Sequence, residues 1–316
     1  MELFYKEGGF PKGVVNLVTC SRVEADILLT DERVKAVTFV GTTGVGKQVY
    51  SKAAAHGKRV QAQCEAKNHA LVLEDCNLEA TVNAIINSTY GCAGMRCMAL
   101  PVVCVQESIA DEFVALLKKK AEAMKLGCAY DEATDLGPVV NAGHKEKICS
   151  WIQKGIDEGA ELVLDGCNVV VPGYENGFFV GPTILDHVTP EMTVGNREIF
   201  GPVTCIKRVK DYEEGIAIMN ANPFANGSCI FTQSGYYSRK FAMETDGGMV
   251  GINVGIPVPT AYFPFSGNKD SFFGDLHVLG KDGYRFFTRA KTVTTHWFDE
   301  AAGKRKVGTW EGSTEA

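Results

Sequence analysis

The stretch Val34-Lys35-Ala36-Val37-Thr38-Phe39-Val40-Gly41-Thr42-Thr43-Gly44-Val45-Gly46 decides the fold. Its first half is rich in β-branched residues and predicts a buried strand over 34–40. The glycines that follow predict a tight turn into a helix over about 47–55. The segments Arg59-Val60-Gln61-Ala62-Gln63 and Ala70-Leu71-Val72-Leu73 predict two more strands. This alternation is typical of an α/β fold, with parallel strands and helices on both faces of the sheet.

The segments on either side extend the same pattern. Upstream, the residues predict an amphipathic helix at the N-terminus and a buried strand over 13–18. Downstream, helices are predicted over 77–90, 109–123, 141–158 and 212–220. Further strands are predicted over 101–105, 161–164, 178–184, 204–209 and 228–231. The length of 316 residues suggests about two domains.

The composition excludes several classes of function. The chain is 45% hydrophobic and 22% charged, with a net charge of −6. A negative net charge offers no basic surface for nucleic acid or an anionic membrane. No apolar run approaches the ~20 residues that span a bilayer. We therefore expect neither a nucleic-acid partner nor a membrane partner.

The eleven cysteines are odd in number and irregularly spaced, which favours reduced thiols over a disulfide framework. Cys92, Cys97 and Cys104 are the closest group, but they contain no C-x-x-C pair, so no metal site is expected. The remaining cysteines are most simply small buried apolar residues, together with Cys104. They are Cys20, Cys64, Cys76, Cys128, Cys149, Cys167, Cys205 and Cys229.

Two segments suggest chemistry. The glycine loop over 41–46 lies between a predicted strand and a predicted helix, where backbone amides could bind a phosphate. It is neither G-x-G-x-x-G nor a Walker motif, despite Lys47, and a plain tight turn is the commoner explanation. In a second loop Cys97 follows Arg96. A cationic neighbour lowers the pKa of a thiol, which makes Cys97 a candidate nucleophile.

Five motifs in order carry a family resemblance. They are the 39–46 glycine loop, Gly94-x-Arg96-Cys97, Glu198-Ile199-Phe200-Gly201-Pro202-Val203, Gly251-Ile252-Asn253 and Phe265-Ser266-Gly267-x-Lys269-x-Ser271. Together they resemble the aldehyde dehydrogenase superfamily over residues 1–297. The resemblance implies that the family's N-terminal third lies upstream of this chain, so that the sequence is a truncated or degenerate relative.

The resemblance also implies NAD as cofactor. Gly41, Thr42 and Gly46 would lie near its pyrophosphate. Glu198 would bind the nicotinamide ribose hydroxyls, because a carboxylate accepts two hydrogen bonds, and Phe200 would pack near that ribose. The alternatives from the residues alone are a structural salt bridge between Glu198 and Arg197, and a core position for Phe200.

In the same family Cys97 would attack an aldehyde to give a thiohemiacetal, which becomes a thioester after hydride loss. The Cys97 backbone N–H would stabilise the oxyanion. Hydrolytic members use a glutamate as general base, but the matching position here is Gln63, which has no titratable group. We therefore expect a thiol, coenzyme A, to release the acyl group in place of water.

The stretch Ala66-Lys67-Asn68-His69 resembles CoA-acylating methylmalonate-semialdehyde dehydrogenases. Their substrates carry a carboxylate, which Arg96 would bind, and the products would be propionyl-CoA or acetyl-CoA. His69 is expected to be a structural residue. Glu65 replaces a glycine of the subfamily, and it would either obstruct the cofactor or act as a shifted base.

Two other functions stay open at this stage. One is a non-catalytic relative that serves as an assembly or dosage partner, and the other is a hydrolytic aldehyde dehydrogenase with another substrate. The expected organisation is a remnant NAD domain over 1–65, a catalytic domain over 66–264, a return segment over 265–297 and a disordered tail over 298–316. A strand near 288–297 would build a dimer or tetramer. The expected location is the mitochondrial matrix in a eukaryote and the cytoplasm otherwise.

Overall fold

The computed structural model describes residues 2–297, and its largest sheet has seven strands. Their spatial order is β10-β9-β3-β4-β7-β6-β5, and all neighbours are parallel except β5 and β6. The strands are β3 (His69–Val72), β4 (Val102–Gln106), β5 (Glu161–Leu164), β6 (Thr183–Asp186), β7 (Val203–Val209), β9 (Gly227–Phe231) and β10 (Met249–Ile252).

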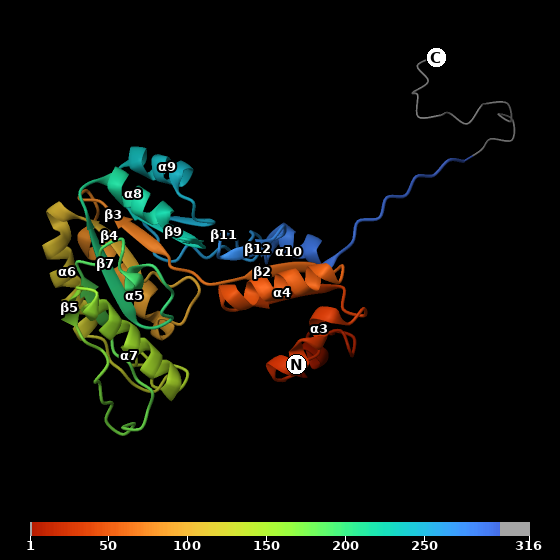
Figure 1. The fold of residues 1–316 in the computed structure, drawn as a ribbon, viewed down its shortest axis with the longest axis horizontal. Coiled ribbons are helices and arrows are strands. Elements are labelled where there is room, and N and C mark those ends of the chain that lie inside the picture. The colour runs from red at the N-terminus through yellow and green to blue at the C-terminus, as the bar shows by residue number, and fades with distance from the viewer. Residues whose placement is uncertain (1, 298–316) are drawn as a thin grey trace, which may run out of the picture.

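Helices cover both faces of this sheet (Figure 1). On one face lie α5 (Leu78–Tyr90), α6 (Glu107–Glu122) and α7 (Ala142–Asp157), and on the other lie α8 (Tyr212–Ala221) and α9 (Gly235–Glu244). Alternate strand residues divide between two cores: Val72 packs with the first group of helices, and Leu71 with the second. A mostly parallel sheet buried on both sides confirms the α/β fold.

A second sheet contains the segment quoted first. In it β2 (Arg59–Gln63) pairs in parallel with β1 (Ala36–Val40) and antiparallel with β12 (Phe272–Gly274). Helix α4 (Thr43–Ala55) begins four residues before the predicted start, so Gly46 lies inside it. A Cβ on Gly46 would be 2.3 Å from Cys64 Sγ, and this close approach requires glycine. The smaller pair β8 (Phe224–Ala225) and β11 (Asn268–Lys269) is antiparallel, and α10 (Gly280–Phe287) follows.

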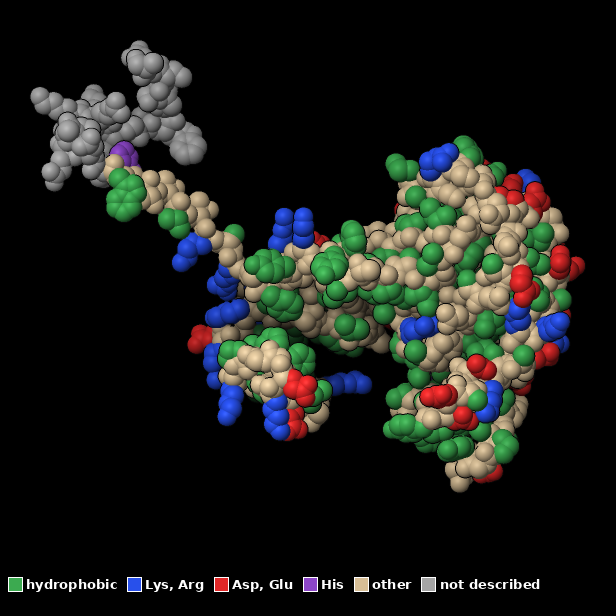
Figure 2. Space-filling view, turned by 180° about the vertical axis from the view of Figure 1, so that it is seen from behind, with side chains coloured by type: hydrophobic (Ala, Val, Ile, Leu, Met, Phe, Trp, Pro, Cys, Tyr) green, Lys and Arg blue, Asp and Glu red, His purple; other side chains and the backbone are tan. Residues whose placement is uncertain are grey.

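The N-terminal region departs from the prediction. It contains α1 (Glu2–Lys6), α2 (Arg22–Ala25) and α3 (Ile27–Thr30), but the strand predicted over 13–18 is wrong. Val14, Leu17 and Val18 are exposed, because in the described chain β1 pairs with β2 alone and no strand lies beside 13–18. In Figure 2 this region stands across a hollow from the larger body.

Other boundaries move less. The strand predicted over 178–184 is β6 at 183–186, although Phe179 and Val180 are buried. Residues 288–297 lie in no helix or strand and run away from the body (Figure 1), so the oligomerisation strand stays a prediction. The tail predicted over 298–316 lies outside the described residues. Within the described part, no helix has the length and apolar character needed to cross a membrane.

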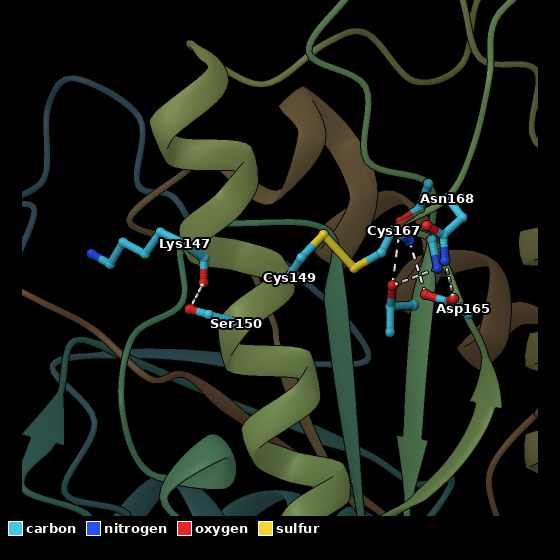
Figure 3. Close-up of a disulfide and its surroundings, with 9 residues drawn as sticks. Lys147, Cys149, Ser150, Asp165, Cys167 and Asn168 are labelled. Carbon is cyan, nitrogen blue, oxygen red and sulfur yellow. Dashed lines mark hydrogen bonds between the residues drawn. A yellow bond between two sulfur atoms is a disulfide. The ribbon is translucent and has the colours of Figure 1, made fainter.

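The expectation of reduced thiols is wrong for one pair of cysteines. Cys149 on α7 forms a disulfide with Cys167 in the loop after β5, with the Cα atoms 5.7 Å apart (Figure 3). The prediction of burial also fails for Cys20, which is exposed, and for Cys76, Cys128, Cys149 and Cys167, which are half-buried. It is confirmed for the remaining four, which are Cys64, Cys104, Cys205 and Cys229.

We expect Cys149→Ser to lower the free energy of unfolding by roughly 2–3 kcal/mol, because the disulfide closes a short loop of the unfolded chain. Its two cysteines are 18 residues apart. The measurement is urea unfolding under non-reducing conditions. Cys20→Ser is the matched control and should leave the midpoint unchanged. Adding a dithiol should bring the wild-type protein to the midpoint of the variant, and equal midpoints without reductant would contradict the pairing.

Candidate active site

The loop that carries Cys97 is shaped by left-handed residues. Helix α5 ends at Tyr90, and the short helix η1 (Gly91–Gly94) follows with Cys92 at φ 55° and Ala93 at φ 53°. Gly94 has φ +67°, and a Cβ there would lie 2.1 Å from the carbonyl oxygen of Gly201. Only glycine fits such a contact. The Cys97 loop is thereby pressed against the 198–202 segment.

Two buried amides hold the backbone of Cys97. The Nδ2 atom of Asn68 donates to the Cys97 carbonyl at 2.9 Å, and Nδ2 of Asn226 donates to it at 3.0 Å. Asn68 comes immediately before β3, and Asn226 comes immediately before β9. The loop is therefore fixed from the ends of two neighbouring strands, while the Cys97 residue itself stays exposed.

A cavity of about 630 Å³ brings most of the predicted site residues together. Those that line it are Gly41, Thr42, Arg96, Cys97, Glu198 and Phe200. Two predicted residues do not line it. Gly46 lies within α4 and faces Cys64. The Gln63 side chain points toward Phe265, and its Nε2 donates to the Phe265 carbonyl at 3.2 Å.

Glu198 lies in a desolvated position. One of its carboxylate oxygens accepts from the Ala66 N–H at 3.1 Å. Burial raises the pKa of Glu198 to about 7, and repulsion from Glu65 adds to the rise, while the Ala66 hydrogen bond and the Lys147 charge oppose it. No ion pair joins Glu198 to Arg197 in the described chain.

Phe200 is held in a left-handed conformation, with φ 63°, which is unusual for a bulky residue. Its carbonyl lies 2.8 Å from Nε2 of His144 on α7. The ring is exposed at the cavity, so the structure does not support a core position for Phe200. Backbone strain of this kind gathers at binding sites, where neighbouring contacts maintain it.

The charge environment of Cys97 differs from the prediction. Desolvation raises the pKa of the Cys97 thiol above its ordinary value, and the Glu198 carboxylate adds to this rise. The Arg96 charge lowers the pKa, but its effect is smaller than that of the backbone hydrogen bonds. The reason lies in the Arg96 side chain, whose Nη2 donates to the carbonyls of Asn87 and Ser88 at 2.5 and 3.0 Å. The guanidinium therefore neutralises the carboxyl end of α5 more than it activates the thiol. Its Nε is buried and has no hydrogen-bond partner in the described chain.

His69 has the structural environment expected of it. It is buried, and its Nδ1 lies 2.7 Å from the Lys67 carbonyl oxygen. Burial and the Lys207 charge hold the pKa of His69 well below its usual range, which keeps the ring neutral. A neutral, enclosed imidazole of this kind stabilises the fold around the site.

Two basic residues of the cavity were not predicted from the sequence. His144 and Lys147 both come from α7, far along the chain from Cys97 and Glu198. Neither belongs to a recognisable motif, and only the packing of α7 over the 198–202 segment brings them near. The close contact of Ile148 with Gly201 shows this packing, because a Cβ on Gly201 would lie 2.7 Å from Ile148.

Comparison with known proteins agrees with this geometry. The profile of the aldehyde dehydrogenase family matches residues 1–293. Malonate-semialdehyde dehydrogenase 1 of Oceanobacillus iheyensis is 47% identical over 298 residues, which are 94% of this chain and 61% of that protein. Malonate-semialdehyde dehydrogenase 2 of Bacillus mycoides is 49% identical over 296 residues, again 94% and 61%. The chain thus spans about three fifths of the length of the curated relatives it matches.

Solved structures give the same result. Methylmalonate-semialdehyde dehydrogenase from Oceanimonas doudoroffii superposes with a TM-score of 0.91 and 43% identity, over 94% of this chain and 61% of that one. A chain from Sinorhizobium meliloti complexed with NAD has the same TM-score and 42% identity, over 93% and 60%. From its motifs, its fold and these matches, the chain belongs to the aldehyde dehydrogenase family.

Proposed function

We propose that this protein takes part in the NAD-dependent, CoA-acylating oxidation of malonate or methylmalonate semialdehyde through a thioester on Cys97. The observation that carries the proposal is the shared cavity, which places Cys97, Glu198 and Phe200 beside the start of α4. The names of the relatives from Oceanobacillus iheyensis and Oceanimonas doudoroffii support the substrate class.

The residues of the cavity suit NAD in two respects. The Glu198 carboxylate can accept hydrogen bonds from a ribose, and the N-terminus of the 13-residue helix α4 favours an anion. In this assignment Gly41 and Thr42 border the phosphates, and Phe200 lies along the nicotinamide ribose. NAD, when bound, supplies the acceptor for the hydride that leaves the substrate carbon.

The chain's own residues account for the acylation step. The Cys97 sulfur attacks the aldehyde carbon, and the Cys97 N–H donates to the oxyanion that forms. The Cys97 thiol has a raised pKa, so its proton must pass to an acceptor as the carbon–sulfur bond forms. Arg96 lines the same cavity, and a planar guanidinium suits the carboxylate of the proposed substrate.

Coenzyme A is proposed as the acyl acceptor because Gln63 stands where hydrolytic family members have their general base. Gln63 cannot ionise, and its amide is bonded to the Phe265 carbonyl. Water attacks a thioester slowly without a general base, whereas a thiol needs little assistance. We propose that the acyl-enzyme first loses its carboxylate as carbon dioxide. The CoA thiol then attacks the thioester carbon and the Cys97 sulfur leaves, which gives acetyl-CoA or propionyl-CoA.

The experiment that tests this proposal mixes the purified chain with NAD and malonate semialdehyde and follows NADH, with and without CoA. We expect a burst of up to one equivalent, followed by a slow phase that CoA accelerates at least about a hundredfold, the low end of what general-base catalysis contributes. A steady rate that does not respond to CoA would indicate a hydrolytic enzyme. Absence of both burst and turnover would indicate a non-catalytic relative.

Assembly and location are proposals of the same kind. We propose a homo-oligomer, a dimer or a tetramer, formed through residues 288–297. Val293 and Trp297 are exposed in the single chain, and this supports the proposal. The proposed location is the mitochondrial matrix for a eukaryotic source and the cytoplasm otherwise.

A further inference from the structure

The carboxylate of Glu65 lies at the N-terminus of α4. Its Oε2 accepts from the backbone N–H of Thr43, the first residue of the helix, at 2.9 Å. The N-cap residue Thr42 forms no side-chain capping bond, so Glu65 supplies from outside the helix the acceptor that a cap would provide. A negative charge is stabilised there by the helix dipole.

Hydrogen bonds on both sides of Glu65 fix its backbone. Ser271 is buried, and its Oγ donates to the Glu65 carbonyl at 2.7 Å. The N–H of Cys64 donates to the Ser271 carbonyl at 2.8 Å, and the N–H of Ala225 donates to the Ser271 hydroxyl at 3.1 Å. With the main chain held on both sides, the Glu65 side chain reaches the start of α4.

We propose that Glu65 is an internal competitor for the diphosphate of the cofactor. The inference rests on the proposed NAD function, in which the start of α4 faces the phosphates. A phosphate oxygen and the Glu65 carboxylate would accept from the same Thr43 amide, and two anions at one helix end repel each other. Binding of NAD then requires the Glu65 side chain to leave Thr43, which weakens the affinity.

The alternative role of Glu65, a shifted general base, has less support. A general base must come within hydrogen-bond reach of the water it activates, which in turn lies beside the thioester. Glu65 is absent from the lining of the cavity that contains Cys97, and its carboxylate is engaged at α4. Its charge still reaches Glu198, whose pKa it helps to raise.

The test measures the dissociation constants of NAD⁺ and ADP-ribose by calorimetry for the full chain and its variants. Glu65→Gln keeps the size of the side chain and removes its charge, and Glu65→Ala removes both. We expect both ligands to bind about tenfold tighter or more to Glu65→Gln, with a larger gain for Glu65→Ala. A tenfold gain is about 1.4 kcal/mol. Glu112→Gln, an exposed change on α6, is the matched control and should bind as the wild type does.

The ligand pair separates the possible explanations. ADP-ribose has the diphosphate but no nicotinamide, so a gain for NAD⁺ alone would overturn the proposal and point to bulk near the nicotinamide. Unchanged binding of both ligands to Glu65→Gln, with measurable NAD⁺ binding by the wild type, would overturn it while leaving the proposed function intact. If no variant binds NAD⁺ at all, the NAD function itself fails and the inference fails with it. A cooperative urea transition confirms that each variant folds; the midpoint of Glu65→Ala should lie somewhat below that of the wild type, because the Thr43 N–H loses its acceptor.

Discussion

Replacing Cys97 by serine is expected to abolish formation of the acyl-enzyme and to reduce NADH production by about 10⁴-fold or more, as removal of a catalytic nucleophile does. The hydroxyl of serine is a far weaker nucleophile than a thiolate. The measurement is the amplitude of the NADH burst in rapid-mixing experiments. A parallel measurement is covalent labelling by a thiol-reactive aldehyde analogue, located by peptide mass spectrometry.

Cys92→Ser is the matched control for this prediction. Cys92 belongs to the same loop and is also exposed, but it does not line the cavity. It has φ 55°, a conformation that serine tolerates about as well as cysteine does. The burst should therefore persist in Cys92→Ser, and one label per chain should be found on Cys97. A normal burst in Cys97→Ser, or a label on Cys92, would refute the assignment of the nucleophile.

The fold was largely predictable because the strands and helices of an α/β chain have local signatures. The strand over 59–63 lies where it was predicted, and the helix over 77–90 begins after Asn77, whose side chain caps it through the Ala80 N–H. The strand over 13–18 was wrong for a tertiary reason. Its sequence is suited to a sheet, but a strand needs a neighbour to pair with, and the local pattern does not include that neighbour.

The site was only partly predictable. Motifs singled out Cys97 and Glu198, which line one cavity, but the electrostatics of that cavity depend on the directions in which the side chains point. Arg96 precedes Cys97 in the sequence, yet its guanidinium binds the end of α5, so the predicted lowering of the thiol pKa was wrong. The Cys149–Cys167 disulfide escaped prediction because nothing in a spacing of 18 residues shows that α7 lies against the loop after β5.

Glu198→Gln is expected to stabilise the fold at pH 8 while weakening the enzyme. The pKa of Glu198 is raised from 4.5 to about 7, so the folded state binds its proton more tightly than the unfolded state. The cost of ionising Glu198 is absent below pH 4.5, grows between pH 4.5 and 7, and is complete above pH 7. The shift corresponds to roughly 3 kcal/mol, which glutamine recovers only at the higher pH.

The measurement is urea unfolding of both proteins at pH 4.5 and pH 8. Glu198→Gln should gain stability at pH 8 and show little difference at pH 4.5, whereas the exposed control Glu112→Gln should match the wild type at both. Glutamine cannot replace the charge-assisted hydrogen bonds to a ribose, so kcat/KM for NAD should fall about tenfold to hundredfold. A variant with the same pH dependence of stability as the wild type would show that Glu198 is not desolvated. Ionised Glu198 costs the fold stability, and such a carboxylate is expected to serve ligand binding. A variant with unchanged kcat/KM for NAD would show that Glu198 does not bind the cofactor.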